Sequence, residues 1–483
     1  MKPTNLVFIM SDEHDPRHMG CYGSSTVQTP NLDKLAARGT RFTSAYTSCP
    51  ICVPARASWA TGQYVHRIRY WDNAMGYDGA IKGWGHKLQE SGVRVESIGK
   101  LHYRNADDPT GFDKQTDPMH IYQGIGQVWG SIRDPLPAKR DFKMIKEIGA
   151  GESSYNRYDA AVADSAVEWL KQAATQSSDQ PFVLYLGFVA PHFPFVVPQE
   201  YFDMYPMEDI PLPTKLHPST GAALHPWLVD QSLFAQTDTG LSDDDRRACI
   251  AAYYGLCTYL DHQIGKVLNT INEVGLGETT RIVYTSDHGE NLGVRGTWGK
   301  SNMYQEATRI PLILAGPDVP KGKVCNTAAN FVDYYHTILD AAGVAGEQTS
   351  SERPGSSLWP IAAEQDDQSR TSFSEYHAVG APSGAFMVRK GQYKFHYYVG
   401  YPPELFDLSA DPEETNDLAG DPAYAETMQM MEQELRRIVD PETAHAQALT
   451  DQADLVNRFG GRDAAMGLGT PGATPPPGAE KHE

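Results

Sequence analysis

The sequence predicts an α/β fold in which helices sandwich a large, mostly parallel mixed β-sheet, with a small α+β unit near the C-terminus. Apolar runs that resemble buried strands alternate with helical patterns along most of the chain, which is typical of a parallel sheet. From about residue 370, short strand patterns precede a final helix, which indicates a separate antiparallel sheet. The 483 residues are enough to bury one large core and a smaller one.

Local patterns justify the individual elements. The run 6–10 (LVFIM) is apolar and ends at an acidic pair, as expected for a buried strand. Thr29 precedes a proline and begins a short helix. Ser242 and Asp245 match a capping box before a long helical pattern. The other expected strands are 94–99, 181–190, 281–286 and 309–316.

We expect three parts along the chain. Residues 1–368 form a catalytic α/β domain, and residues 369–440 form the small α+β subdomain. Residues 441–483 are expected to be a tail that covers its own or a partner's active site, or contacts another copy of the chain. The Gly- and Pro-rich end of this tail is typical of extended chain.

Composition excludes several classes of function. With 41 basic and 61 acidic residues, the formal charge is −20, so a nucleic acid is not an expected partner. The N-terminal apolar run is too short for a signal peptide, and no stretch approaches 18 apolar residues, so we expect no membrane partner. Six mostly isolated cysteines do not form a disulfide framework, which favours a cytoplasmic protein.

Reactive side chains follow four of the expected strands. Loops at the carboxyl ends of parallel strands share one edge of a sheet, where ligands bind in open α/β folds. Turn chemistry or helix capping would explain each group singly, but their occurrence together predicts one composite site. The carboxylates offer hard oxygen ligands, which suit calcium, magnesium or manganese. The side chains are Asp12, Glu13, Lys100, His102, His192, Asp287 and His288.

The segment 47–62 (TSCPICVPARASWATG) adds a cysteine pair to this set. Cys49 and Cys52 could be a redox pair, half of a zinc site, two core thiols, or include one modified nucleophile. Pro54 suits the first turn of a helix, which places Cys52 at a helix N-terminus that favours an anion. Arg56 lies four residues later, on the same helix face.

From NLVFIMSDE to ELFDLSADPEETNDLAG, the chain resembles type I sulfatases of the alkaline phosphatase superfamily. The most specific element is Cys52-x-Pro54-x-Arg56 followed by Thr61-Gly62, the signature at which the family converts cysteine to formylglycine. The resemblance implies an alkaline phosphatase-like sheet, a small sulfated substrate, and a formylglycine-generating enzyme as partner during maturation. It also implies hydrolysis of a sulfate monoester by a formylglycine hydrate derived from Cys52.

The resemblance carries roles onto individual residues. It implies a divalent metal, calcium first with magnesium or manganese as alternatives, held by Asp12, Asp287 and His288. Glu13 would be the fourth ligand, at a place where many members have aspartate.

The remaining predicted roles concern the sulfate ester. Arg56 and Lys100 would orient the formylglycine hydrate, and His102 would be the base that releases sulfate. Lys300 would bind the sulfate oxygens, and His192 would help to protonate the leaving alcohol.

Two other functions stay open at this level. Phosphonate monoester and phosphodiester hydrolases resemble the chain in PHFPF and from HPWLVDQ to YYGLCTYLD, although GKLHY matches the sulfatases. A homologue that binds sulfated ligands without turnover is the third reading.

The alcohol part of the substrate has weaker signals. YWDNA and SEY resemble segments of choline sulfatases, in which aromatic and acidic residues can hold a quaternary ammonium. A small alkyl sulfate, an aryl sulfate and a sulfated sugar all stay open, and a homo-oligomer is a further expectation. The predicted substrate-binding residues are Trp71, Asn73, Glu375 and His377.

Overall fold

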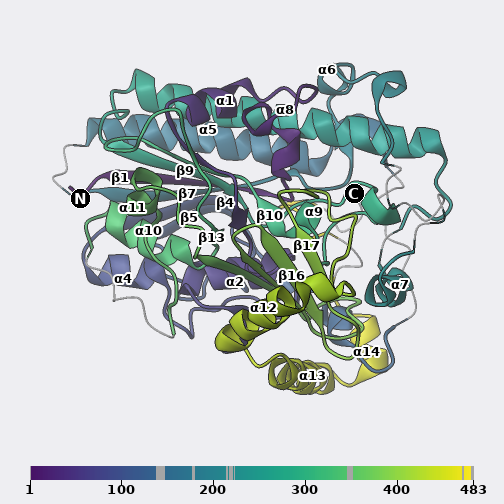
Figure 1. Cartoon of the computed structure of the whole chain (residues 1–483). Helices are drawn as coiled ribbons and strands as arrows, with labels where there is room; N and C mark the ends of the chain where they lie inside the picture. Colours follow the sequence, from purple (N-terminus) through teal and green to yellow (C-terminus); the bar gives the residue numbers. More distant parts are fainter. Residues whose placement is uncertain are drawn as a thin grey trace.

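An eight-stranded mixed β-sheet forms the centre of the computed structural model (Figure 1). The structure describes residues 2–137, 147–176, 180–213, 216, 221, 223–235, 237–344, 352–469 and 473–479. The strand order is β12-β2-β11-β9-β1-β7-β4-β5. The strands are β1 (Asn5–Asp12), β2 (Gly39–Phe42), β4 (Arg94–Lys100), β5 (Lys114–Met119), β7 (Phe182–Pro191), β9 (Thr280–Ser286), β11 (Leu312–Ala315) and β12 (Lys323–Cys325).

The five strands from β9 to β5 run parallel, and the sheet becomes mixed only toward the other edge. There β11 pairs antiparallel with both β9 and β2, which confirms the predicted mixed sheet. The expected strand 309–316 is split, because its first two residues form β10 (Arg309–Ile310) in a separate small sheet with β3 and β13.

Helices cover both faces of this sheet (Figure 1). Strand β1 shows why, since its side chains alternate between two buried clusters. Val7 and Ile9 pack in the cluster on the side of α5 and α8, whereas Leu6, Phe8 and Met10 pack on the other side. The helices on the two faces are α1 (Pro30–Ala37), α5 (Ser154–Thr175) and α8 (Asp243–Glu273), and α2 (Cys52–Thr61), α4 (Trp84–Glu90) and α10 (Asp333–Ala341).

Helix α8 is the longest of the described helices. Ser242 Oγ accepts from the Asp245 amide and the Asp245 side chain accepts from the Ser242 amide, so the predicted capping box is confirmed. Cys249 and Cys257 are both buried on this helix, as core thiols would be.

The C-terminal part has its own antiparallel sheet, β14 (Thr371–Tyr376), β15 (Ala385–Lys390), β16 (Tyr393–Tyr398) and β17 (Glu404–Asp407). Helix α12 (Ala425–Ile438) packs against β15 and β16. The segment from residue 441, expected to be a tail, instead continues as α13 (Pro441–Arg458) and α14 (Arg462–Met466). Among the described residues of this segment, 473–479 lie outside any helix or strand and include a turn.

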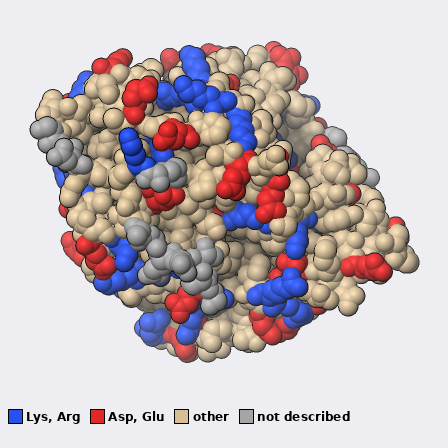
Figure 2. Space-filling view, turned by 60° about the vertical axis from the view of Figure 1, so that its left-hand side comes forward, with Lys and Arg blue, Asp and Glu red and all other residues tan. Residues whose placement is uncertain are grey.

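Among described helices, none is both long and apolar enough to cross a membrane. Figure 2 shows acidic and basic groups interspersed on one face of the molecule.

The short elements are α3 (Val65–Ile68), α6 (Gln199–Phe202), α7 (Pro226–Ser232), α9 (Gln305–Thr308), α11 (Leu358–Ala363), β3 (Ala45–Tyr46), β6 (Gly149–Ala150), β8 (Val196–Val197) and β13 (Ala329–Asn330).

Candidate active site

The site begins where β1 and β9 end side by side. The two strands pair in parallel up to Ser11 and Ser286, so Asp12 and Asp287 emerge next to each other. The Glu13 amide donates to Asp287 Oδ1 (3.3 Å), which ties the two loops together. His288 follows directly, and its Nδ1 lies 3.0 Å from the Gly289 carbonyl oxygen. That contact assigns the proton to Nδ1 and leaves the Nε2 lone pair facing the site.

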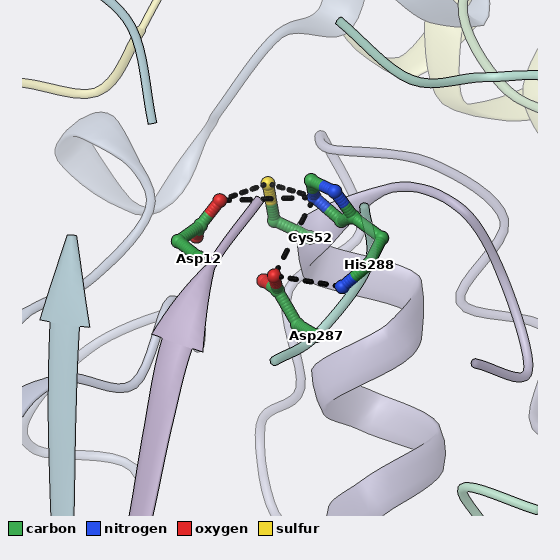
Figure 3. A group of neighbouring side chains, drawn as sticks. All are labelled: Asp12, Cys52, Asp287 and His288. Atoms are coloured by element: carbon green, nitrogen blue, oxygen red, sulfur yellow. Dashed lines mark hydrogen bonds and ion pairs between the residues drawn. The ribbon is translucent and has the colours of Figure 1, made fainter. Parts of the chain in front are cut away.

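Cys52 is the first residue of α2 and points at this edge (Figure 3). Its sulfur lies 3.1 Å from His288 Nε2 and 3.6 Å from Asp12 Oδ1. Burial, reinforced by Asp12, raises the pKa of Cys52 above the ordinary thiol value. Cys49 is also buried with a raised pKa, and both cysteines are free. These neutral thiols do not resemble the low-pKa cysteines of redox motifs.

Arg56 lies one helical turn after Cys52 and is fully buried. Its Nε donates to Asp287 Oδ2 (2.8 Å) and its Nη2 to Asp12 Oδ2 (3.1 Å). Nη1 donates to the Lys100 carbonyl and to the Tyr185 hydroxyl, at 2.9 Å each. Nε and Nη2 thus orient the two carboxylates, while Nη1 fixes the guanidinium to the end of β4 and to Tyr185.

Three further cationic or titratable side chains reach Asp12 or its neighbour Glu13. Lys100, at the end of β4, places Nζ 2.7 Å from Asp12 Oδ2. Lys300 Nζ lies 3.1 Å from Glu13 Oε1, and His192 Nε2 lies 3.5 Å from Glu13 Oε2. The structure therefore brings together the residues that the sequence placed at four separate strand ends.

His102 completes the group and contacts the C-terminal segment. Its Nε2 lies 2.9 Å from Thr474 Oγ1, and the Tyr155 hydroxyl donates to the Thr474 carbonyl (2.5 Å). Burial and the nearby charges of Lys100 and Arg56 hold the pKa of His102 well below its usual value. His102 is therefore neutral near pH 7 and able to accept a proton.

Two overlapping groups of side chains at this edge could hold a cation. Ligand atoms of Asp12, Cys52, Asp287 and His288 lie within 4.8 Å of one another, and Asp12 and His192 form a second such group with Glu13. Buried Glu13 is paired with Lys300 but accepts no regular hydrogen bond on either carboxylate oxygen, and its backbone φ is 70°. Burial raises the pKa of Glu13 well above its usual value, against the effect of Lys300. A divalent cation would fit this hard, under-compensated donor set.

A cavity of about 120 Å³ opens beside Cys52. Its floor includes Lys100, His102, His192 and Lys300, and its walls are largely aromatic and aliphatic. Of the four predicted substrate-binding residues, only Asn73 is among the described residues that line it. The lining residues that the sequence analysis missed are Ile51, Gln127, Trp129, Phe193, Phe234, Ala235, Trp298, Gly299, Ser301, Val379, Ala473 and Thr474.

The other three predicted substrate-binding residues are occupied elsewhere. Glu375 is buried, and its carboxylate accepts from the His66 amide (3.0 Å) and pairs with His66 Nδ1 (2.9 Å) and His377 Nε2 (3.1 Å). Trp71 is buried against His377, with ring centroids 4.8 Å apart, and donates to Asp451 (2.7 Å). These contacts correct the expectation that Trp71, Glu375 and His377 bind the substrate. The three side chains have packing and structural roles instead.

The sulfatase family model matches residues 4–344, and the C-terminal model of N-sulphoglucosamine sulphohydrolase matches residues 293–440. The chain belongs to the sulfatase family. It is a sulfuric ester hydrolase with an α/β fold of the alkaline phosphatase type.

Relatives of this sulfatase cover nearly its whole length. Choline-sulfatase from Rhizobium meliloti is 31% identical over 86% of this chain and 83% of its own length. Arylsulfatase K from Bos taurus is 28% identical over 90% of this chain and 82% of its own length.

Solved structures show the same fold. Phosphonate monoester hydrolase from Agrobacterium radiobacter has a TM-score of 0.73 at 21% identity and covers 92% of this chain and 96% of its own. Its counterpart from Silicibacter pomeroyi has a TM-score of 0.70 at 25% identity and covers 90% of this chain and 94% of its own.

Asp159 on α5 supports the turn that carries His192 in this sulfatase. Its carboxylate accepts from the amides of Val189 (2.8 Å) and Ala190 (2.7 Å), and burial raises its pKa to about 7. A carboxyl with a raised folded-state pKa stabilises the fold below its unfolded pKa, and that stability is lost as pH rises through the folded pKa.

We therefore expect the free energy of unfolding of wild type to fall by about 2–3 kcal/mol between pH 5 and 8, relative to Asp159→Asn. Urea unfolding at several pH values measures this difference. Asp164→Asn is the control, since Asp164 lies on the same helix, exposed, 3.2 Å from Lys266. An equal pH slope in wild type and Asp159→Asn would contradict the assignment.

Proposed function

We propose that the chain is a formylglycine-dependent sulfatase that hydrolyses the sulfate monoester of a small alcohol. One observation carries the proposal: Cys52 stands at a helix N-terminus between the Asp12, Asp287 and His288 group and a cavity floored by four cationic or titratable side chains. Formylglycine at position 52, as its hydrate, would supply an oxygen nucleophile for sulfur and a second hydroxyl whose deprotonation releases sulfate. A formylglycine-generating enzyme is the partner that this function requires.

The cationic side chains would bind the ester and stabilise charge. Lys300 and Lys100 would hold the sulfate oxygens, where negative charge is spread in the transition state. Arg56 would keep Asp12 and Asp287 in the orientation that their shared hydrogen bonds already show. These side chains are preorganised because each is buried and already bonded.

Two histidines would handle the protons. His192 Nε2, near Glu13, would donate a proton to the alcohol oxygen as the sulfur–oxygen bond breaks, so that the alcohol leaves neutral. Burial and Lys300 lower the pKa of His192, so this step needs the bound sulfate ester, whose negative charge would raise that pKa and place a proton on Nε2. His102 would accept the proton of the second hydroxyl as the carbonyl group re-forms and sulfate departs.

The cation completes the proposed site. Asp12, Asp287 and His288 would hold it, with Glu13 as the fourth ligand, and calcium fits the oxygen-rich donor set best, with magnesium or manganese as alternatives. Such a cation lowers the pKa of a bound hydroxyl and neutralises part of the sulfate charge.

The size and chemistry of the cavity favour a small alcohol. Pockets for drug-sized ligands are typically several-fold larger than the roughly 120 Å³ found here. Trp129, Phe234 and Trp298 offer apolar contact area around the alcohol position. A sulfated oligosaccharide would be a poor fit for this space.

A matched pair of esters tests the reaction. We expect 4-nitrophenyl sulfate to be hydrolysed with a kcat/KM at least about tenfold above that of 4-nitrophenyl phenylphosphonate, because the two share a leaving group and differ in the transferred group. Release of 4-nitrophenol and of inorganic sulfate is measured directly. Preference for the phosphonate would favour the phosphonate monoester hydrolase alternative, and sulfate binding without any turnover would favour a non-catalytic homologue.

The C-terminal segment gives a separate prediction. Ala473 and Thr474 line the cavity, so ending the chain at Leu468 should widen it and expose His102. We expect kcat/KM for small sulfate esters to fall several-fold while bulkier aryl sulfates gain relative to them. Thr474→Val keeps the wall but removes the hydroxyl, and should retain the preference for small esters. An unchanged preference in the truncated chain would show that the segment does not limit substrate size.

A further inference from the structure

The loop that carries Lys300 is fixed to the C-terminal sheet by buried charges. Lys394 Nζ on β16 lies 2.7 Å from Glu414 Oε1, and both side chains are fully buried. His396, also on β16, lies 3.5 Å from the same oxygen through Nε2 and 3.1 Å from Glu404 through Nδ1. A buried ion pair of this kind adds little to stability on its own, so its geometry calls for another explanation.

Glu414 contacts the Lys300 loop on both sides of Lys300. Its Oε2 accepts from the amide of Gln305 (2.6 Å), at the start of α9. The backbone carbonyls of Glu413 and Glu414 accept from Nη2 of Arg295, at 2.9 Å each. Arg295 lies five residues before Lys300 and Gln305 lies five residues after it.

A further ion-pair chain leads from this loop to the segment that follows the carboxylates of β1. Arg295 Nη1 pairs with Glu306 Oε2 (3.1 Å), and Glu306 Oε1 pairs with Arg17 Nη1 (3.0 Å). Arg17 also pairs with Asp15, three residues after Asp12. The C-terminal sheet, the Lys300 loop and the β1 loop are therefore linked by one set of mostly buried charges.

Glu414 is held in a conformation that sequence alone would not favour. Its φ of 54° lies in the left-handed region, which costs free energy for a residue with a side chain. Burial opposes ionisation, but Lys394 and nearby His396 prevail and lower the pKa of Glu414 to about 2. The carboxylate is therefore charged at neutral pH and oriented on both oxygens.

We propose that Glu414, paired with Lys394, is a positioning residue that sets the place of Lys300 at the sulfate site. This inference rests on the proposed role of Lys300 in binding sulfate. The C-terminal subdomain then supplies no atom to the reaction. It determines how firmly the Lys300 ammonium group is held in its position facing Glu13 and the cavity.

Direct binding of inorganic sulfate tests this without turnover. The variant Lys394→Met with Glu414→Met removes both charges together, so neither is left alone in the core. We expect calorimetry to show a sulfate Kd at least about tenfold weaker than that of wild type. Glu414→Gln, which keeps the side-chain volume, is the second variant and should show a smaller loss.

A matched control and a double-mutant cycle separate positioning from general damage. Lys390→Met with Glu434→Met removes an ion pair of 2.8 Å from the same subdomain, away from the Lys300 loop, and should leave sulfate binding unchanged. In a Lys300→Ala background, loss of the Lys394–Glu414 pair should weaken sulfate binding no further.

Several results would overturn the proposal. The first is a sulfate Kd that stays unchanged in both Glu414 variants. The second is an equal loss of sulfate affinity in the Lys390→Met and Glu434→Met control. The third is a loss of sulfate affinity in the Lys300→Ala background as large as the loss that the same change causes in wild type. A wild-type protein that binds sulfate but hydrolyses no sulfate ester would refute the proposed function alone, since the Kd comparison would still decide the role of Glu414.

Discussion

Cys52→Ala is expected to lower kcat for any sulfate ester by at least about 10⁴-fold, because it removes the thiol that conversion of residue 52 to formylglycine requires. The protein should still fold, since the change deletes one small buried group and leaves the carboxylates paired with Arg56 and Lys100. Sulfate release under saturating substrate measures the loss, and a thermal melt verifies the fold.

Cys49→Ala is the matched control for that experiment. Cys49 is equally buried and lies three residues earlier, but no contact of its thiol joins it to the Asp12, Asp287 and His288 group among the described residues. We expect its activity to stay within about threefold of wild type. Equal losses in both variants would support a redox pair rather than a modified Cys52.

Arg56→Met is expected to lower the free energy of unfolding by about 3–5 kcal/mol, the usual result of leaving buried charges without their partner. Two carboxylates, Asp12 and Asp287, lose their guanidinium partner at 3.1 and 2.8 Å. Activity should fall as well, because the same carboxylates would no longer be oriented. Denaturant unfolding in the presence of a chelator measures the destabilisation.

Calcium should restore part of the stability lost in Arg56→Met, since a cation bound to the folded state stabilises it by mass action. Arg94→Met is the control: Arg94 pairs with Glu96 at 2.6 Å but is 40% exposed, so its loss should cost less than about 1 kcal/mol. A destabilisation of Arg56→Met no larger than that of Arg94→Met would contradict the role given to Arg56.

Much of the fold was predictable because it depends on local pattern. The apolar run of β1 and the capping box of α8 were both visible in the sequence. The run 309–316 was less informative, because an apolar run does not say whether a strand is parallel, and β11 is antiparallel to β9. The helices from residue 441 were missed because the Pro- and Gly-rich end dominated the composition of that region.

The polar side of the site was predicted better than its apolar side. Asp12, Lys100, His192 and Asp287 follow separate strands, so parallel pairing alone brings them to one edge of the sheet. No such rule places Trp129, which lines the cavity from a 3₁₀ turn.

Acidic residues near a motif proved to be a poor guide to the substrate. Glu375 looked available for a cationic substrate, but two histidines occupy its carboxylate. The contact between Glu414 and the loop that carries Lys300 was equally hidden, because it arises only through tertiary packing of a second sheet.

The state of Cys52 tests the central proposal most directly. Mass spectrometry of the peptide 47–62 should be performed on protein produced with and without a formylglycine-generating enzyme, with sulfate release measured on the same samples. We expect a mass about 18 Da below that of the cysteine peptide, present in proportion to the specific activity. Full activity from protein whose Cys52 remains an unmodified thiol would contradict the proposal.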